Sequence, residues 1–428
     1  MKRVLILLCL GLSLGINAKT VVLLDSIVTE TKNKRTAKEI YEYDEYGREK
    51  WDIKYVADTK GDFVPETKVR TIYEDTYTVE WQYSWDASCD CWRTNYSKNV
   101  SFNAEGLITS VSTVYYIDTE YEFDSKSSIT ITYKYNAKKL LTEAITEKGT
   151  TLEAPTTLSK KEVYSYNSRD SLETREEYSY QDKAWVGSNK VENIYKDTLG
   201  RYRIVLQNMP KWNSTTKDFT TNQAKITYHY NVDESETKTI FAYTLGNWYE
   251  GQKEVFYYED GLLMEYNKYS MDSGTGKLYK SNITDNSYDG RGNLTESYCS
   301  VYIDGMGWCK SRKYEYKYDD ANNCIEYNSW LGDYEQDVWV QSVHYARTFD
   351  VYGNILTHTI FSTQNNDVLA IQNYYYSTFE IQDGGEATEI DNVYSPVKLD
   401  VTSKFIRDGQ LFIRRGDEIF NAQGARVK

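Results

Sequence analysis

The sequence predicts an all-β protein made of tandem antiparallel β-hairpins, about 30 residues each, that form one extended coiled sheet, spiral or shell. Three observations support this prediction: the composition, a pair of apolar landmarks that recurs along the chain, and a period of two within each unit. Tyrosine occurs 42 times and proline 4 times among 428 residues. Because tyrosine favours strands and carries a polar hydroxyl, this composition is typical of β-structure with half-exposed faces.

The first landmark is an aromatic residue that is followed, with one exception, by Asp, Asn or Glu. We call these aromatic residues the first markers; the exception is Tyr195, which precedes Lys196. Their spacing averages about 30 residues. The first markers are Tyr43, Tyr73, Phe102, Tyr135, Tyr166, Tyr195, Tyr230, Tyr258, Tyr288, Tyr318, Phe349 and Phe379.

A second landmark, a large apolar residue, lies ten residues before most first markers. Its members at this spacing are Phe63, Trp92, Trp185, Trp248, Leu278, Trp308, Trp339 and Leu369. Between the two landmarks, apolar and polar residues alternate, as in "ITITYKYN" (129 to 136) and "RKYEYKYD" (312 to 319). This period of two is expected of a strand with one face covered.

Turn residues follow the first markers in "DGRGN" (289 to 293), "DDANN" (319 to 323) and "DVYGN" (350 to 354). Asp, Asn and Gly tolerate the positive φ that tight turns require. Each unit is therefore predicted to be strand, tight turn, strand, loop, which gives some two dozen strands in one meander. Because open sheets rarely exceed about 10 strands without curling or splitting, this sheet should coil, with equivalent aromatics paired across strands.

The motif "YEYDEYGREKW" (41 to 51) resembles the YD repeat of Rhs-type proteins, and "NSYDGRGNLTE" (286 to 296) is similar. The resemblance covers roughly residues 36 to 385 and implies hairpins that wind into a shell at the cell surface. The chain also resembles aromatic-rich tandem-repeat secreted proteins of Bacteroidetes type. The period is longer than is usual for YD repeats and no toxin-sized segment follows the array, so we expect a shell or spiral without an enzyme inside.

The two ends of the chain predict export. Residues 1–18 have the basic start, apolar stretch and small Ala18 of a cleaved signal peptide, and residues 19–35 are interpreted as a lead-in. After the array and a linker at 386–403, residues 404–428 resemble the C-terminal sorting module of type IX secretion substrates. That resemblance implies transfer across the outer membrane, with the secretion machinery as a partner; the alternative is a capping hairpin for the array. The tripeptide Arg415-Gly416-Asp417 is interpreted as a turn.

The cysteines and histidines predict no metal site. Cys299 and Cys309 flank a turn and are the candidate disulfide, whereas Cys89 and Cys91 are too close in sequence for an easy bridge. His229, His344 and His358 lack zinc-site spacing to the thiols. Calcium at Asp319-Asp320 and Asn322-Asn323 is a minor alternative, because this stretch lacks the signature of a dedicated loop.

Charge and motif content limit the function further. The net charge of −14 argues against nucleic acid as a partner. The sequence contains no catalytic constellation and no cofactor motif, so the chain is predicted not to be an enzyme. No transmembrane segment is expected after the signal peptide.

The sequence leaves two functions open: a surface or secreted binding scaffold for glycan or protein, and a structural or protective shell component. Repeated tryptophans support the first, since they can stack on sugar rings, but they also suit packing within a hairpin. The candidate ligand-contact residues are Trp185, Trp248, Trp308 and Trp339.

Overall fold

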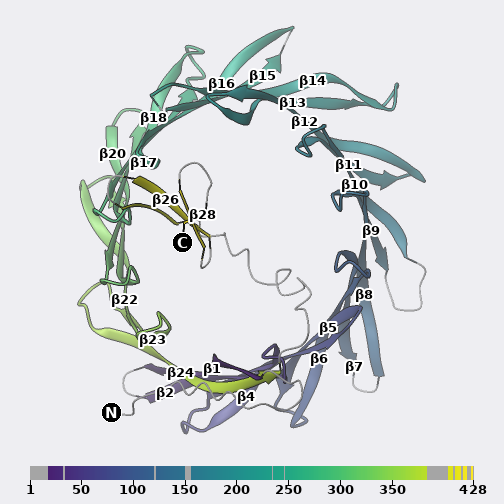
Figure 1. Cartoon of the computed structure of the whole chain (residues 1–428), viewed down its shortest axis with the longest axis vertical. Helices are drawn as coiled ribbons and strands as arrows, with labels where there is room; N and C mark the ends of the chain where they lie inside the picture. The colour runs from purple at the N-terminus through teal and green to yellow at the C-terminus, as the bar shows by residue number, and fades with distance from the viewer. Residues whose placement is uncertain are drawn as a thin grey trace.

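The chain forms a closed antiparallel β-barrel of 24 strands (Figure 1). The computed structural model describes residues 18–31, 34–119, 122–149, 156–233, 235–244, 246–382 and four short strands between 403 and 427. The barrel strands are β1 (Ala18–Thr31), β2 (Lys34–Tyr43), β3 (Glu49–Ala57), β4 (Phe63–Glu74), β5 (Tyr77–Asp86), β6 (Cys91–Phe102), β7 (Ile108–Thr119), β8 (Glu122–Tyr135), β9 (Leu141–Gly149), β10 (Thr157–Tyr166), β11 (Leu172–Gln181), β12 (Ala184–Thr198), β13 (Arg201–Asn213), β14 (Asp218–Tyr230), β15 (Glu236–Thr244), β16 (Asn247–Glu259), β17 (Leu262–Met271), β18 (Leu278–Tyr288), β19 (Leu294–Ile303), β20 (Gly307–Tyr318), β21 (Cys324–Asp333), β22 (Val338–Phe349), β23 (Ile355–Phe361) and β24 (Val368–Gln382).

The first and last strands close the ring. β1 pairs with β24 from Ala18 opposite Gln382 to Glu30 opposite Ile371. The predicted two dozen antiparallel hairpin strands are confirmed. The predicted extended coiled sheet or spiral is wrong, because the sheet closes on itself as a barrel. Closure pairs the backbone N–H and C=O groups along the free edges of β1 and β24. In an open sheet these groups would have no hydrogen-bond partner in the sheet. The residues predicted as a lead-in (19–35) supply most of this closing strand.

Seven turns at one rim of the barrel share one geometry. In the hairpin between β2 and β3, Asp44 Oδ1 accepts the backbone N–H groups of Tyr46 and Arg48, at 2.9 and 3.0 Å. The fourth turn residue, Gly47, has φ 77°, where a side chain would strain the backbone. Asn103, Asn136, Asn167, Asp289, Asp319 and Asp350 accept the equivalent pairs of bonds.

Five of these turns are preceded by a first-marker tyrosine whose hydroxyl bonds to the preceding unit, and the other two by Phe102 and Phe349. Tyr318 Oη, for example, donates to the backbone carbonyl of Leu294 at 3.0 Å. The bond joins β20 to β19, which belongs to the hairpin before it. Equivalent bonds of 2.6 to 3.0 Å are made by Tyr43, Tyr73, Tyr135, Tyr166, Tyr195, Tyr230, Tyr288 and Tyr376. Burial raises the pKa of Tyr43 and Tyr73 to about 12, so these hydroxyls remain donors.

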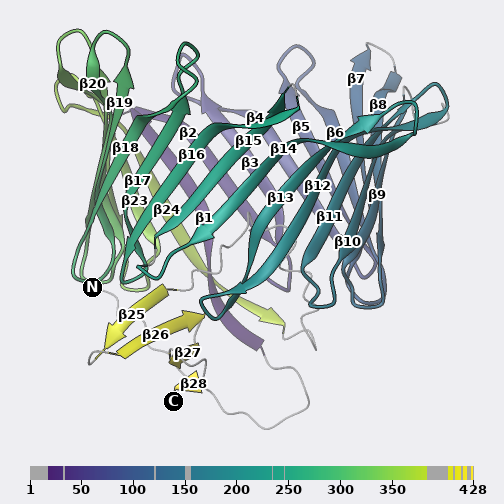
Figure 2. The same ribbon diagram turned by 90° about the horizontal axis from the view of Figure 1, so that it is seen from above.

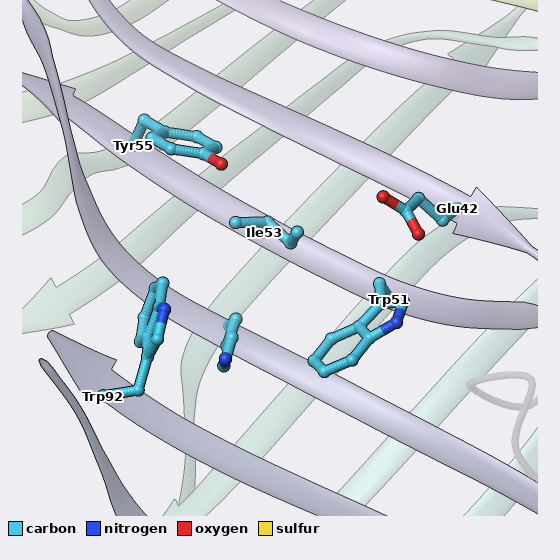
Figure 3. Close-up of a pocket in the computed structure, with 6 residues that line it drawn as sticks. Glu42, Trp51, Ile53, Tyr55 and Trp92 are labelled. Carbon is cyan, nitrogen blue, oxygen red and sulfur yellow. The ribbon is translucent and has the colours of Figure 1, made fainter.

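The strand register divides the wall into two faces, since directly paired residues lie on the same face. The hydroxyl-bonded tyrosines lie on one face, and all ten tryptophans lie on the other. Figure 2 shows the wall from the side, and Figure 3 views it from outside the ring, with the opposite strands behind Trp51 and Trp92. The tryptophans therefore point outward and the first-marker tyrosines point into the lumen.

The lumen face confirms the predicted cross-strand aromatic pairs. Tyr327 on β21 lies between Tyr316 on β20 and Tyr345 on β22, with ring centroids 5.2 and 4.8 Å apart. His358 on β23 extends this row, 4.9 Å from Tyr345. Such aromatic pairs each stabilise a sheet by about 0.2–1 kcal/mol.

The C-terminal tail forms a separate four-stranded antiparallel sheet: β25 (Ser403–Arg407), β26 (Gln410–Arg415), β27 (Glu418–Asn421) and β28 (Arg426–Val427). The predicted turns at Asp408-Gly409, Gly416-Asp417 and Gln423-Gly424 lie outside the described residues. The predicted signal peptide, apart from Ala18, and all but the last residue of the linker lie outside the described residues. Within the described residues, no helix is long and apolar enough to cross a membrane.

Gly332 provides a test of the register. A Cβ at this position would lie inside the van der Waals contact distance of the Lys310 backbone carbonyl. We expect Gly332→Ala to reduce the free energy of unfolding by about 2 kcal/mol or more, because a backbone atom cannot swing away. Gly290→Ala is the control, since a Cβ there meets no atom within 4 Å. Equal urea midpoints for the two variants would contradict this register.

Candidate functional site

The four tryptophans singled out from the sequence all lie on the outer face and all pack against tyrosines. Trp185 contacts Tyr180 and Trp248 contacts Tyr243, with centroid distances of 5.0 and 5.1 Å. The other two pairs are Trp308 with Tyr302 at 5.7 Å and Trp339 with Tyr298 at 5.4 Å. These contacts join neighbouring or nearby strands, as the packing interpretation expects. Trp308 nevertheless keeps 45% of its surface exposed.

A shallow hollow elsewhere on the outer face brings two other tryptophans together (Figure 3). It has a volume of about 190 Å³ and lies over β2, β3, β4 and β6. Its lining residues are Glu42, Trp51, Ile53, Tyr55, Lys68 and Trp92. We call it the Trp51–Lys68–Trp92 hollow.

Lys68 is the centre of this hollow. Its Nζ lies 5.2 Å from the ring centroid of Trp51, 4.5 Å from that of Trp92 and 4.8 Å from that of Tyr83. Aromatic faces carry partial negative charge and therefore attract the ammonium group. Burial, and secondarily the charge of Arg70, lower the pKa of Lys68 from its ordinary value.

Strand pairing places these residues side by side. Ile53, Lys68 and Tyr83 lie directly opposite one another on β3, β4 and β5. Trp51 faces Arg70, whose guanidinium lies 5.3 Å from the indole centroid. On the other side, Trp92 packs edge-on against Trp85 at 5.1 Å. The rings are thus held by the barrel wall before any ligand arrives.

The sequence analysis did not identify this site, although a regular pattern marks it. A lysine lies five residues before a first marker in seven units, at mid-strand on the outer face. We call these lysines the lysine belt: Lys38, Lys68, Lys161, Lys190, Lys225, Lys253 and Lys313. Trp185 and Trp248 belong to this arrangement, because Lys161 Nζ lies 5.1 Å from the ring centroid of Trp185 and Lys225 Nζ lies 4.4 Å from that of Trp248.

The cysteines pair differently from the predicted way. The structure joins Cys89 to Cys91 across the turn between β5 and β6, which corrects the expectation that they are too close. Cys299 and Cys309 are free thiols. Cys309 faces Val301, whereas Cys299 faces Arg312, so the two lie diagonally across β19 and β20. Diagonal neighbours are about 7–8 Å apart, which is wider than a disulfide normally spans.

The acidic turn considered for calcium is occupied by its own contacts. Asp319 accepts the turn N–H groups of Ala321 and Asn323, and Asp320 pairs with Arg291 of the preceding hairpin. Among the described residues, no group of three or more His, Cys, Asp or Glu side chains is placed to hold a metal ion.

A carboxylate cluster lies on the lumen face of β2 and β3, behind the hollow. Lys54 Nζ lies 2.7 Å from Glu39 and 3.7 Å from Asp52. Burial, and then the charge of Glu39, raise the pKa of Asp52 from its ordinary value of 3.8 to about 7. One Asp52 oxygen is buried and makes no hydrogen bond. Burial in this cluster therefore disfavours the ionised form of the Asp52 carboxyl.

Comparisons with known proteins leave the chain without an assigned family. No family model and no curated protein matches it. Among solved structures, it is similar to a porin-like protein from Bacteroides uniformis at 12% identity, covering 72% of this chain and 94% of that one, with a TM-score of 0.22. A protein of unknown function from Bacteroides fragilis matches at 16% identity, over 36% of this chain and 89% of that one, with a TM-score of 0.19.

A third match is the TcdB2-TccC3-Cdc42 structure, at 9% identity over 95% of this chain and 27% of that one, with a TM-score of 0.21. At TM-scores this low, none of the three carries an argument about function here.

The Asp52 cluster predicts a pH-dependent stability. Because the folded state holds the Asp52 proton more tightly than the unfolded state, stability should fall as pH rises from about 4 to about 7. We expect Asp52→Asn to raise the free energy of unfolding at pH 8 by about 1–2 kcal/mol and to leave it unchanged near pH 4. Thermal unfolding at both pH values measures this. Asp320→Asn, at an exposed carboxylate, is the control, and an equal gain at both pH values would contradict the prediction.

Proposed function

We propose that this chain is an exported, non-enzymatic carbohydrate-binding barrel, located at or outside the cell surface, whose outer wall faces water. The observation that carries the proposal is the Trp51–Lys68–Trp92 hollow, where two indole rings and a lysine line a shallow outward-facing depression. A sugar ring presents an apolar face that stacks on indole and hydroxyls that bond to polar groups. Lys68 and Glu42 supply such polar groups beside the rings.

The scaffold suits this role because it fixes the aromatic rings. Trp51 is flanked by Lys68 and Arg70, and Trp92 by Trp85. Side chains that are already ordered lose little conformational entropy when a ligand binds. A rigid, shallow aromatic platform can therefore hold a sugar without a deep pocket.

Charge on the outer wall supports a barrel surrounded by water. A lipid-facing wall needs an apolar band about 25 Å tall, and a lysine at the bilayer midplane costs about 2–4 kcal/mol. The lysine belt lies at mid-strand on the outer face, together with the ion-paired glutamates Glu176 and Glu296. Export itself rests on the predicted signal peptide and on the sorting-like tail.

A second candidate function is a structural or protective container, and the closed wall is the observation that favours it. A barrel of 24 strands, spaced about 4.8 Å and tilted about 40°, is roughly 48 Å across between backbones. Side chains from both sides leave a lumen of roughly 30 Å, by analogy with the aqueous channels of 16–18-stranded barrels. The shell that the YD resemblance implies is a related arrangement.

A glycan array tests the first candidate with the purified mature protein. Trp51→Ala and Trp92→Ala should each lower the affinity for the bound glycan about tenfold or more, because each removes one stacking surface. Trp308→Ala is the matched control, since Trp308 is exposed on the same face but lies outside the hollow. Circular dichroism checks that all three variants fold.

The carbohydrate proposal would be overturned if the protein bound no glycan on the array. It would also be overturned if folded Trp51→Ala and Trp92→Ala variants bound as well as the parent. The container would then be the remaining candidate.

Deletion of residues 404–428 tests the export step. The tail forms its own sheet, so the barrel should still fold, while the protein should stay inside the cell envelope instead of appearing outside. Immunoblots of cell fractions and medium measure its location. Undiminished appearance outside the cell would leave the tail as a cap only.

A further inference from the structure

We propose that the lysine belt makes the outer wall selective for acidic glycans, with uronic-acid carboxylates bound by lysines whose neighbouring rings hold the sugars. This inference rests on the proposed carbohydrate binding and specifies the ligand class. Three sites carry it: the Trp51–Lys68–Trp92 hollow and two equivalents farther along the barrel.

The second site has the same layout as the hollow. Ile145, Lys161 and Tyr178 lie opposite one another on β9, β10 and β11, as Ile53, Lys68 and Tyr83 do on β3, β4 and β5. Lys161 Nζ lies 4.6 Å from the Tyr178 ring centroid and 5.1 Å from that of Trp185.

The third site lies on β14, β15 and β16. Lys225 faces Phe241, and its Nζ lies 4.9 Å from that ring centroid and 4.4 Å from that of Trp248. Lys253 on β16 likewise faces an aromatic residue on the next strand, Tyr269 on β17, and its Nζ lies 5.6 Å from that ring centroid. The layout is therefore a repeated feature of the wall.

Six of the seven belt lysines fall into two classes. Lys190 is held by Glu176 and Glu192, at 2.9 and 3.1 Å, and Lys313 by Glu296 and Glu315, at 3.3 and 2.6 Å. Among the described residues, Lys68, Lys161, Lys225 and Lys253 have aromatic rings over them and no carboxylate within ion-pair distance.

The second class lacks a counter-charge that a ligand could supply. A uronate fits both elements of each site, because its carboxylate pairs with the ammonium group while its ring lies against indole. A neutral sugar would use only the ring contact, so the lysine supplies the discrimination.

The spacing of the sites favours a polymer. Lys225 and Lys253 are two strands apart, which is about 10 Å in the direction of the hydrogen bonds, and Lys161 is four strands from Lys225, about 19 Å. A glycan chain crossing the strands would meet these sites in series. Binding at several linked sites raises the overall affinity without new contacts.

The test compares polygalacturonate with the same polymer after complete methyl esterification, which removes its charge and keeps its sugar rings. With the full-length mature protein, affinity electrophoresis should show at least tenfold tighter binding to the acidic form in low salt. This preference should shrink as salt is raised from 50 to 300 mM, because salt screens exposed charges.

Lys161→Gln and Lys225→Gln should each weaken binding to polygalacturonate about threefold or more and leave binding to the esterified polymer within twofold. Lys313→Gln is the matched control, since this lysine has the same place in its unit but is paired with two glutamates. It should bind both polymers like the parent.

Equal binding of the two polymers, or equal losses from Lys161→Gln and Lys313→Gln, would overturn the acidic-glycan inference while leaving carbohydrate binding in place. Binding to neither polymer would also overturn the inference, and the neutral sugars of the glycan array then decide the proposed function separately.

Discussion

The pairing of β1 with β24 is the constraint on which the rest of the structure depends. It joins the first and last strands of the array and gives each barrel strand two hydrogen-bonded neighbours. With the ring closed, side chains at alternate positions must point either into the lumen or out to solvent. The first-marker tyrosines lie inside and the tryptophans outside as a consequence of this closure, and the lysine belt lies outside for the same reason.

The repeat provides the joints between neighbouring hairpins. A first-marker tyrosine donates its hydroxyl to a carbonyl of the preceding unit, and the next residue, an Asp or Asn, accepts the N–H groups of its own turn. One Tyr-Asp pair thus satisfies polar groups in two successive hairpins. This explains physically why the motif recurs. Arg291, which bonds to the carbonyls of Asp319 and Asp320 in the next turn, adds a further connection between units.

On the outer face of the wall, tryptophans pack against tyrosines and also lie beside lysines. Trp185 and Trp248 each contact a tyrosine across their hairpin, and each also lies beside a lysine of the belt. The two interpretations considered for these residues are therefore compatible. A ring that stabilises a hairpin on one side can offer its other side to a ligand, and Lys68 occupies this position between Trp51 and Trp92.

The sequence by itself determined the strands, the turns and the number of units, because these depend on local alternation and on turn residues such as Asp44 and Gly47. The four strands of the tail followed from its Asp-Gly and Gly-Asp pairs for the same reason. Closure was decided by tertiary structure, since Ala18–Thr31 and Val368–Gln382 are separated by more than 300 residues and carry no pattern that marks them as partners. The hollow likewise needed the register: Trp51, Lys68 and Trp92 lie on three strands, and no local pattern shows which rings meet over which lysine.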